Sequence, residues 1–143
     1  MTDPVVTRSR RGPATSQTVE ALQDDLEALW DDACHVAERE RMAFTLAVVE
    51  AASNVVDHAV PSSPAGVHLS VELTISPDRL TAEIYEINAE PARIDLEESR
   101  RMDTLADSGR GLALMRTLLD TVVYERRDGT NVWVLSRTRA PHR

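Results

Sequence analysis

The sequence contains no lysine, because its 16 basic residues are all arginine. A Walker A loop needs a lysine beside the phosphates, and no G-x-x-x-x-G-K-[ST] string occurs, so any phosphate site must use another design. A single cysteine, Cys34, excludes an internal disulfide, and no Cys or His residues have the spacing of a zinc site. We expect Cys34 to be a small buried residue.

Long apolar runs and excess positive charge are also missing. No stretch approaches the roughly 20 apolar residues that cross a bilayer, and the first residues lack the apolar core of a signal peptide. The formal net charge is −8, whereas a protein that binds duplex nucleic acid needs a basic face. We therefore expect a cytoplasmic protein that contacts neither membrane nor nucleic acid directly and whose partners are proteins.

The length predicts one domain. With 143 residues, 42% of them hydrophobic, the chain is long enough for a single α/β domain with a core. Residues 1–15 combine proline and glycine with small polar residues, which suits a flexible arm or a weak edge strand, and we expect a mostly disordered arm. The domain would then cover residues 16–138, followed by a tail over residues 139–143.

The spacing of apolar residues predicts helices and strands in the order helix, helix, strand, strand, helix, strand, strand. The expected helices cover residues 16–33, about 41–59 and 109–121, and the expected strands cover residues 67–75, 80–88, 122–126 and 131–137. Ser16 is the expected N-cap of the first helix. This order predicts an α+β two-layer sandwich, in which helices cover one face of a mixed, mostly antiparallel sheet.

Glu50 and Asn54 lie four residues apart on one face of the most apolar helix. Burying a carboxylate and an amide costs free energy unless they are paired or coordinate a ligand. Their presence in an apolar helix therefore indicates a paired or coordinating role. Asn54 offers a neutral oxygen suited to Mg²⁺, and Glu50 can accept a proton. The alternative is that both lie on the solvated edge of an amphipathic helix, and for a Glu and an Asn alone we favour that alternative.

Gly109 and Gly111 lead directly into the helix expected over residues 109–121. Such an entry exposes backbone N–H groups at the positive end of the helix dipole, where a phosphate chain is held without lysine. Glycine also serves ordinary tight turns, so this motif alone is weak support for a phosphate site.

Together these motifs resemble the GHKL ATPase superfamily, which has the Bergerat-type fold. The similar strings are Glu50-x-x-x-Asn54-x-x-x-His58-Ala59 for its N box, Gly109-x-Gly111-Leu112-x-Leu114-Met115 for its second glycine box, and Asp128-Gly129-Thr130-Asn131-Val132-Trp133 for its closing turn. Within the superfamily, the chain is most similar to the compact anti-sigma-factor serine/threonine kinases and related regulators. The resemblance covers about residues 16–138.

The resemblance implies ATP and Mg²⁺ as cofactors. By this resemblance, Glu50 is the general base for the accepting serine and Asn54 is the magnesium ligand. These two roles suit phosphoryl transfer, which depends mainly on positioning and charge neutralisation. The remaining implied contacts are Gly109 and Gly111 with the phosphates and Thr130 with the adenine.

Arginines lie in or beside the loop that would cover the nucleotide. Two roles are open for each of Arg100, Arg101 and Arg110. The arginine either stabilises the charge of the γ-phosphate or is a solvated loop residue, and the sequence favours neither role. For His58 we expect packing or hydrogen bonding at the helix end and no catalytic role.

The first glycine box of the family, Asp-x-Gly, is missing from the sequence. Strand alternation puts Glu86 in the place of the aspartate and Asn88 in the place of the glycine, since both are expected to face inward with Ile84. Counting back from Asp95 puts Ala89 at the glycine instead. Glu86 keeps an acceptor for the adenine amino group, although its extra methylene pushes the base outward. Asn88 adds bulk but tolerates a positive φ.

Two functions follow from the resemblance. The first is an ATP-dependent serine/threonine kinase that holds a sigma factor and phosphorylates an anti-sigma antagonist of the STAS type. The second is a kinase-inactive, protein-binding regulator of the same fold with weak or no nucleotide binding, which would explain the altered first glycine box directly. The resemblance also implies a possible homodimer.

Overall fold

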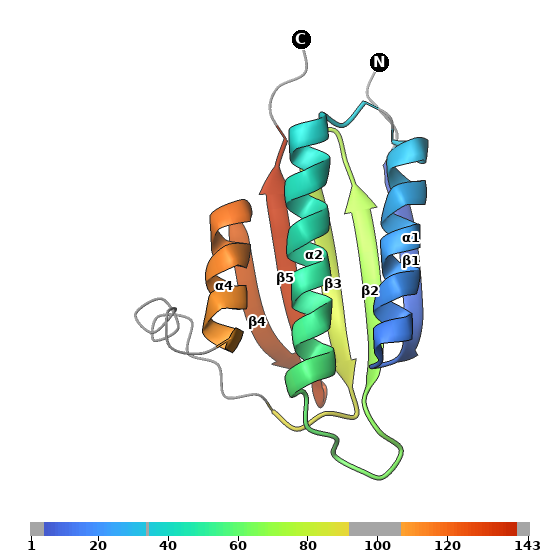
Figure 1. Ribbon diagram of the computed structural model, residues 1–143, viewed down its shortest axis with the longest axis vertical. Helices are drawn as coiled ribbons and strands as arrows, with labels where there is room; N and C mark the ends of the chain where they lie inside the picture. The colour runs from blue at the N-terminus through green and yellow to red at the C-terminus, as the bar shows by residue number, and fades with distance from the viewer. Residues whose placement is uncertain (1–4, 34, 92–106, 140–143) are drawn as a thin grey trace.

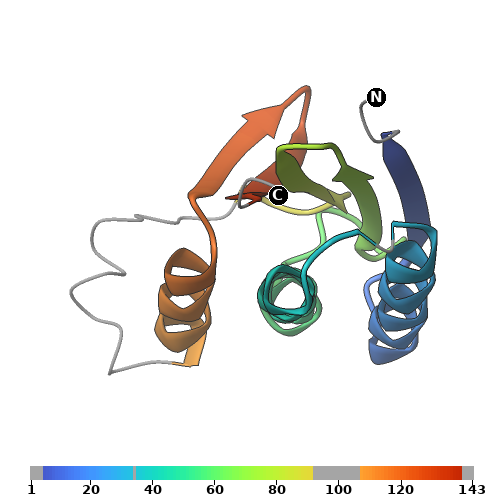
Figure 2. The same ribbon diagram turned by 90° about the horizontal axis from the view of Figure 1, so that it is seen from above.

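The computed structural model describes residues 5–33, 35–91 and 107–139. Its elements are β1 (Val6–Pro13), α1 (Ser16–Asp32), α2 (Glu38–His58), β2 (His68–Ile75), β3 (Arg79–Ile87), α4 (Asp107–Leu118), β4 (Thr121–Arg127) and β5 (Thr130–Thr138). The strands form a five-stranded sheet in the order β1-β2-β3-β5-β4, and the helices cover one of its faces (Figures 1 and 2). The expected α+β two-layer sandwich is confirmed, and all pairings among the described strands are antiparallel.

The core lies between the helix layer and the sheet. Alternate side chains of a strand point to opposite faces, so the apolar residues of one parity in β2 and β3 face the helices and are buried. Leu22 and Leu26 of α1 and Phe44 of α2 fill the space against them and are fully buried. Helix α2 lies centrally in its layer, with α1 on one side and α4 on the other (Figure 1). This central position explains why its sequence is apolar on most sides.

The expected disordered arm is wrong for Val6–Pro13, which form the edge strand β1 paired with β2. Arg10 binds Asp25 of α1 through Nε at 2.6 Å and Nη2 at 2.9 Å. Arg8, which has the same parity in the strand, binds Asp32 at 3.3 Å. These ion pairs hold the strand against the acidic side of α1. Sequence reasoning missed them because alternating arginines without an apolar face are typical of a solvated tail.

The helix boundaries differ slightly from those expected. Thr15, not Ser16, is the N-cap of α1, because its Oγ1 accepts a hydrogen bond from the backbone N–H of Thr18 at 3.4 Å. Helix α2 begins at Glu38, before the expected start, and α4 ends at Leu118, so that β4 begins directly after a short turn. Cys34 lies outside the described residues.

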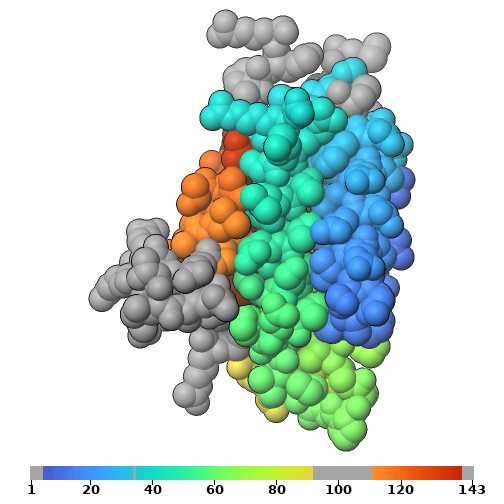
Figure 3. Space-filling view, viewed as in Figure 1, coloured from blue at the N-terminus to red at the C-terminus, as the bar shows by residue number. Residues whose placement is uncertain are grey.

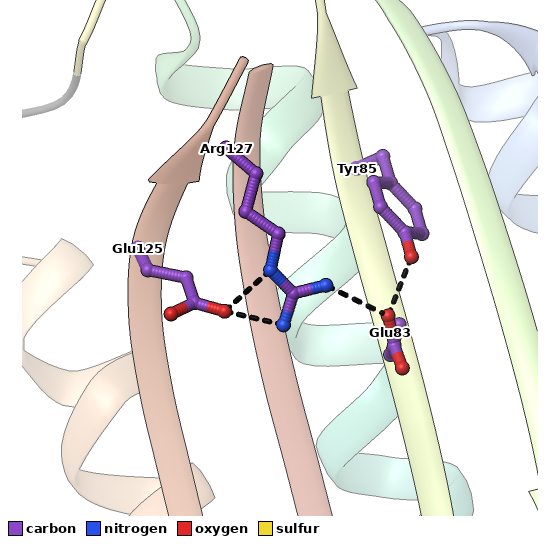
Figure 4. A network of polar contacts seen from close by, with 4 residues as sticks. All are labelled: Glu83, Tyr85, Glu125 and Arg127. Atoms are coloured by element: carbon purple, nitrogen blue, oxygen red, sulfur yellow. Dashed lines mark hydrogen bonds and ion pairs between the residues drawn. The ribbon is translucent and has the colours of Figure 1, made fainter. Parts of the chain in front are cut away.

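The face of the sheet away from the helices carries a polar network (Figure 4). The Tyr85 hydroxyl donates to Glu83 Oε2 at 2.5 Å, and Arg127 Nη1 donates to the same oxygen at 3.3 Å. Arg127 also pairs with Glu125, two residues earlier in the same strand β4. The hydrogen bond to the Glu83 carboxylate, followed by burial, raises the pKa of Tyr85 to about 12.

This raised pKa makes a prediction about alkaline stability. Because the pKa of Tyr85 is higher in the folded state, its hydrogen bond stabilises the fold fully below the unfolded pKa of about 10, and that stabilisation is lost as the pH rises through about 12. The ultraviolet absorbance of tyrosinate, taken as wild type minus Tyr85→Phe, should show a midpoint near 12. Glu83→Gln should move that midpoint toward 10. A midpoint that Glu83→Gln leaves unchanged would contradict the assigned cause.

Candidate functional site

Glu50 and Asn54 meet the first turns of α4 at Gly111. Gly111 is buried, and a Cβ at this position would overlap Glu50 Oε1 and lie 2.9 Å from Asn54 Nδ2. Only a residue without a side chain allows the α4 backbone to approach both polar groups this closely. Both side chains are half-buried between the helices, so the solvated-edge alternative does not describe them.

The sequence of α2 explains why these two side chains point toward α4. Ala47, Val48, Ala51, Ala52 and Val55 are buried and form the side of α2 that packs on the core. Glu50 and Asn54 lie one turn apart beside that apolar face, where α4 packs against α2. Helix α4 is anchored in turn by its own buried apolar residues, Leu112 and Met115.

Glu86 lies at the end of β3 and faces the helices, as the two-residue period predicted. Its side chain is buried, since the residue is only 4% exposed. Glu86 Oε2 accepts a hydrogen bond from Trp133 Nε1 at 2.7 Å, and Oε1 accepts one from Asn131 Nδ2 at 3.3 Å. A carboxylate offers about four lone-pair positions, so acceptor capacity remains for a further donor.

Asn131 is the polar residue that sequence reasoning missed. It is 0% exposed, and its Nδ2 also donates to Glu90 O at 2.7 Å, while its Oδ1 accepts from Arg126 Nη1 at 2.7 Å. Arg126 Nη1 reaches Ala89 O at 3.3 Å as well. These contacts tie the chain after β3 to β4 and β5. An asparagine that shares a strand face with Trp133 and precedes an apolar run was the signal that could have revealed it.

The structure does not bring Thr130 to Glu86, which corrects the placement expected for Thr130. Asn131 is the direct partner of Glu86 in the β3–β5 register. Since neighbouring residues of a strand point to opposite faces, Thr130 points away from the helices. Any adenine contact from β5 would therefore come from Asn131 or Trp133.

Asn88 does not face inward with Glu86, contrary to the expectation from strand alternation. Its φ is +62°, and this left-handed conformation, which asparagine tolerates, ends the two-residue period. Asn88 Nδ2 instead donates to Ser63 Oγ at 2.9 Å and to Gly66 O at 2.8 Å. Ala89, the alternative for the glycine position, is fully buried and forms a β-bridge with Pro61.

The other residues expected at the site are only partly described. Gly109 and Arg110 belong to the first turn of α4, for which the structure gives the course of the backbone. Arg100, Arg101 and Asp95 lie outside the described residues. Within residues 5–33, 35–91 and 107–139, no His, Cys, Asp and Glu side chains gather in threes as a metal cluster, and no helix is long and apolar enough to span a bilayer.

The chemistry of these groups suits a magnesium–phosphate complex at the α2–α4 contact. Mg²⁺ is held at such sites by one or two protein oxygens together with phosphate oxygens, and Asn54 offers an amide oxygen there. The N-terminal turn of α4 offers backbone N–H groups to anions. At the end of β3, the buried Glu86 carboxylate offers a hydrogen-bond acceptor of the kind that the exocyclic amino group of adenine needs. The residues present therefore fit ATP with Mg²⁺.

Comparison with known proteins agrees with this geometry. A family model described as the histidine kinase-like ATPase domain matches residues 12–136. The serine/threonine-protein kinase BtrW of Bordetella bronchiseptica is 32% identical over 115 residues, which are 75% of this chain and 81% of that protein. Both matches extend over the helix layer and the sheet. The chain therefore belongs to the family of histidine kinase-like ATPase domains, as an ATPase regulator of the GHKL type.

Proposed function

We propose that the protein is an ATP- and Mg²⁺-dependent serine/threonine kinase that phosphorylates an anti-sigma antagonist of the STAS type and binds a sigma factor. The observation that carries the proposal is the close approach of Gly111 to Glu50 and Asn54. The 32% identity to a serine/threonine-protein kinase supports the same reaction class. The protein would act in the cytoplasm, and as a homodimer.

ATP supplies the γ-phosphoryl group when it is bound, and Mg²⁺ neutralises charge on the phosphates. The Asn54 side-chain oxygen would hold the metal. The free backbone N–H groups of the first turn of α4, which includes Gly109, would bind phosphate oxygens at the positive end of the α4 dipole. Gly111, one turn further, would let this helix approach Glu50 and Asn54. Glu86 would accept a hydrogen bond from the adenine amino group through its remaining lone pairs.

Glu50 would act as the general base. Its carboxylate lies one helical turn before Asn54, so a serine hydroxyl hydrogen-bonded to it would lie beside the metal ligand. As the serine oxygen bonds to phosphorus, its proton passes to a Glu50 carboxylate oxygen and later to solvent. The half-buried position of Glu50 against α4 keeps the carboxylate in one orientation for this transfer.

Glu50→Gln is the variant that tests this role. Glutamine keeps the size and the contact with Gly111 but cannot take a proton, so phosphoserine formation should fall about 10²- to 10⁴-fold. The affinity for ATP with Mg²⁺ should stay within about twofold, since Glu50 is not assigned to nucleotide binding. Phosphoserine on a STAS-type antagonist is measured by mass spectrometry, and binding by calorimetry. Glu72→Gln, at an exposed position of β2, is the matched control.

Equal rates for wild type and Glu50→Gln would remove Glu50 as the base. A fall in affinity that matches the fall in rate would instead assign Glu50 to binding.

A kinase-inactive, protein-binding regulator is the second candidate function, and the state of Glu86 favours it. Both Glu86 oxygens already accept hydrogen bonds from Trp133 and Asn131, and Asn88 is turned toward the loop at Gly66. If this state excludes adenine, Glu86→Asp/Asn88→Gly should create ATP binding that the wild type lacks. Micromolar binding of ATP by the wild type would remove this candidate.

A further inference from the structure

A row of three polar side chains crosses the sheet from its edge to Glu86. Glu86 of β3, Asn131 of β5 and Arg126 of β4 are direct register partners on three neighbouring strands, and their side chains lie on the helix-facing side. In the space-filling view, α1, α2 and α4 lie side by side over this side of the sheet (Figure 3). Glu86 and Asn131 are buried, whereas Arg126 belongs to the edge strand and is exposed.

The row is a chain of hydrogen bonds that runs in one direction. Arg126 Nη1 donates to Asn131 Oδ1 at 2.7 Å, and Asn131 Nδ2 donates to Glu86 Oε1 at 3.3 Å. An arginine side chain has donors only and a carboxylate has acceptors only, so the Asn131 amide links the two in one orientation. Glu90 O accepts from the same Nδ2 at 2.7 Å and selects the same orientation. Hydrogen bonds in such a chain polarise and strengthen one another.

Arg126 holds the outer end of this chain. Asn131 is 0% exposed, so an Oδ1 that lost the guanidinium would be an acceptor without a donor in the protein interior. The amide would then gain free energy by shifting. Arg126 Nη1 also reaches Ala89 O at 3.3 Å, which ties down the chain that leaves β3 after Glu86. One exposed side chain therefore fixes both the amide beside Glu86 and the segment that follows β3.

We propose that Arg126 is a positioning residue for nucleotide recognition, which acts on the adenine amino group through Asn131 and Glu86. The inference rests on the proposed ATP site, in which Glu86 accepts the hydrogen bond from that amino group. Arg126 keeps Asn131 Nδ2 on one oxygen of Glu86, while Trp133 Nε1 donates to the other at 2.7 Å. With both oxygens held, the carboxylate has one orientation, and its remaining lone pairs keep fixed directions.

Arg126→Met tests this role, because it removes the donor at an exposed position and keeps an unbranched apolar stem. The affinity of the full chain for ATP with Mg²⁺, measured by calorimetry, should fall about tenfold, as expected for losing one hydrogen bond to a charged group. Arg126→Lys returns an N–H donor and the charge, so it should recover most of this loss. Arg127→Met is the matched control, since this neighbour points to the other face of β4 and should change the affinity less than about twofold.

A second nucleotide separates positioning from a merely structural role. The triphosphate of purine riboside is ATP without the exocyclic amino group, so it has nothing to donate to Glu86. Arg126→Met should therefore bind this analogue as tightly as the wild type does. If Arg126→Met weakens ATP and the analogue by the same factor, the arginine supports the fold of the site and the proposal is overturned.

The ligand-free protein gives an independent readout. The Trp133 indole shares the Glu86 carboxylate with Asn131, so Arg126→Met should shift the nuclear magnetic resonance signal of the indole N–H, and Arg126→Lys should restore it. An unchanged indole signal would contradict the coupling. If the wild type binds ATP and Arg126→Met binds it equally well, this inference fails while the proposed ATP site stands. A folded wild type that binds neither nucleotide would overturn both.

Discussion

Gly111→Ala is expected to lower phosphoryl transfer about a hundredfold while the protein stays folded. The new Cβ would overlap Glu50 Oε1 and lie 2.9 Å from Asn54 Nδ2, so both site residues would have to move. These atoms are the far ends of flexible side chains, which can swing away without unfolding the helices. Alanine also has a helix propensity about 1 kcal/mol better than glycine, which offsets part of the steric cost.

The matched control for this change is Gly129→Ala. Gly129 has a φ of +79° and nothing within 4 Å of an added Cβ, so alanine there should cost about 1–2 kcal/mol of stability through backbone strain and leave the transfer rate unchanged. Phosphoserine formation and thermal unfolding are measured on both variants. Gly111→Ala with full activity would show that the close contact of α4 with Glu50 is not needed for the reaction.

Asn131→Ala should lower the free energy of unfolding by about 2–4 kcal/mol. The change removes the hydrogen bonds of Asn131 to Glu86, Glu90 O and Arg126, and leaves the buried Glu86 carboxylate with fewer donors. Losing partners in a buried polar network costs more than any one bond contributes, because the groups left behind are not rehydrated. Denaturant unfolding should show a lower midpoint with an unchanged slope.

Thr130→Ala separates this effect from a general weakening of β5. Thr130 is the preceding residue and points to the other face of the strand, so its loss should cost no more than about 0.5 kcal/mol. If the two alanine variants are equally stable, the network around Asn131 does not organise this end of the sheet.

The fold could be predicted from the sequence because two periods dominate it. Apolar and polar residues alternate strictly in β2, and apolar residues recur at helical spacing in α1, so each element has one buried face. Both patterns can be read from neighbouring residues in the sequence. That Glu50, Asn54 and Gly111 belong to one site followed only from the resemblance to the GHKL superfamily. The local pattern alone favoured a solvated helix edge for Glu50 and Asn54, because it does not show which helix packs beside them.

The errors concern features that depend on contacts between distant residues. The strand β1 has no apolar face of its own and is held by Arg8 and Arg10, whose acidic partners lie on α1. Asn88 does not follow the alternation of strand β3, because its own positive φ turns the chain and ends the two-residue period. Asn131 takes the place expected for Thr130 because β5 pairs with β3, a register that the sequence does not state.

The most direct test of the proposed ATP site is a calorimetric titration of the wild type and Asn54→Ala with ATP, with and without Mg²⁺. The proposal predicts that the wild type binds ATP in the micromolar range when Mg²⁺ is present, and that removing either Mg²⁺ or the Asn54 amide weakens binding at least about tenfold, or about 1.4 kcal/mol. Melting temperatures show that both proteins are folded. Absence of binding by the folded wild type at millimolar ATP with Mg²⁺ would contradict it.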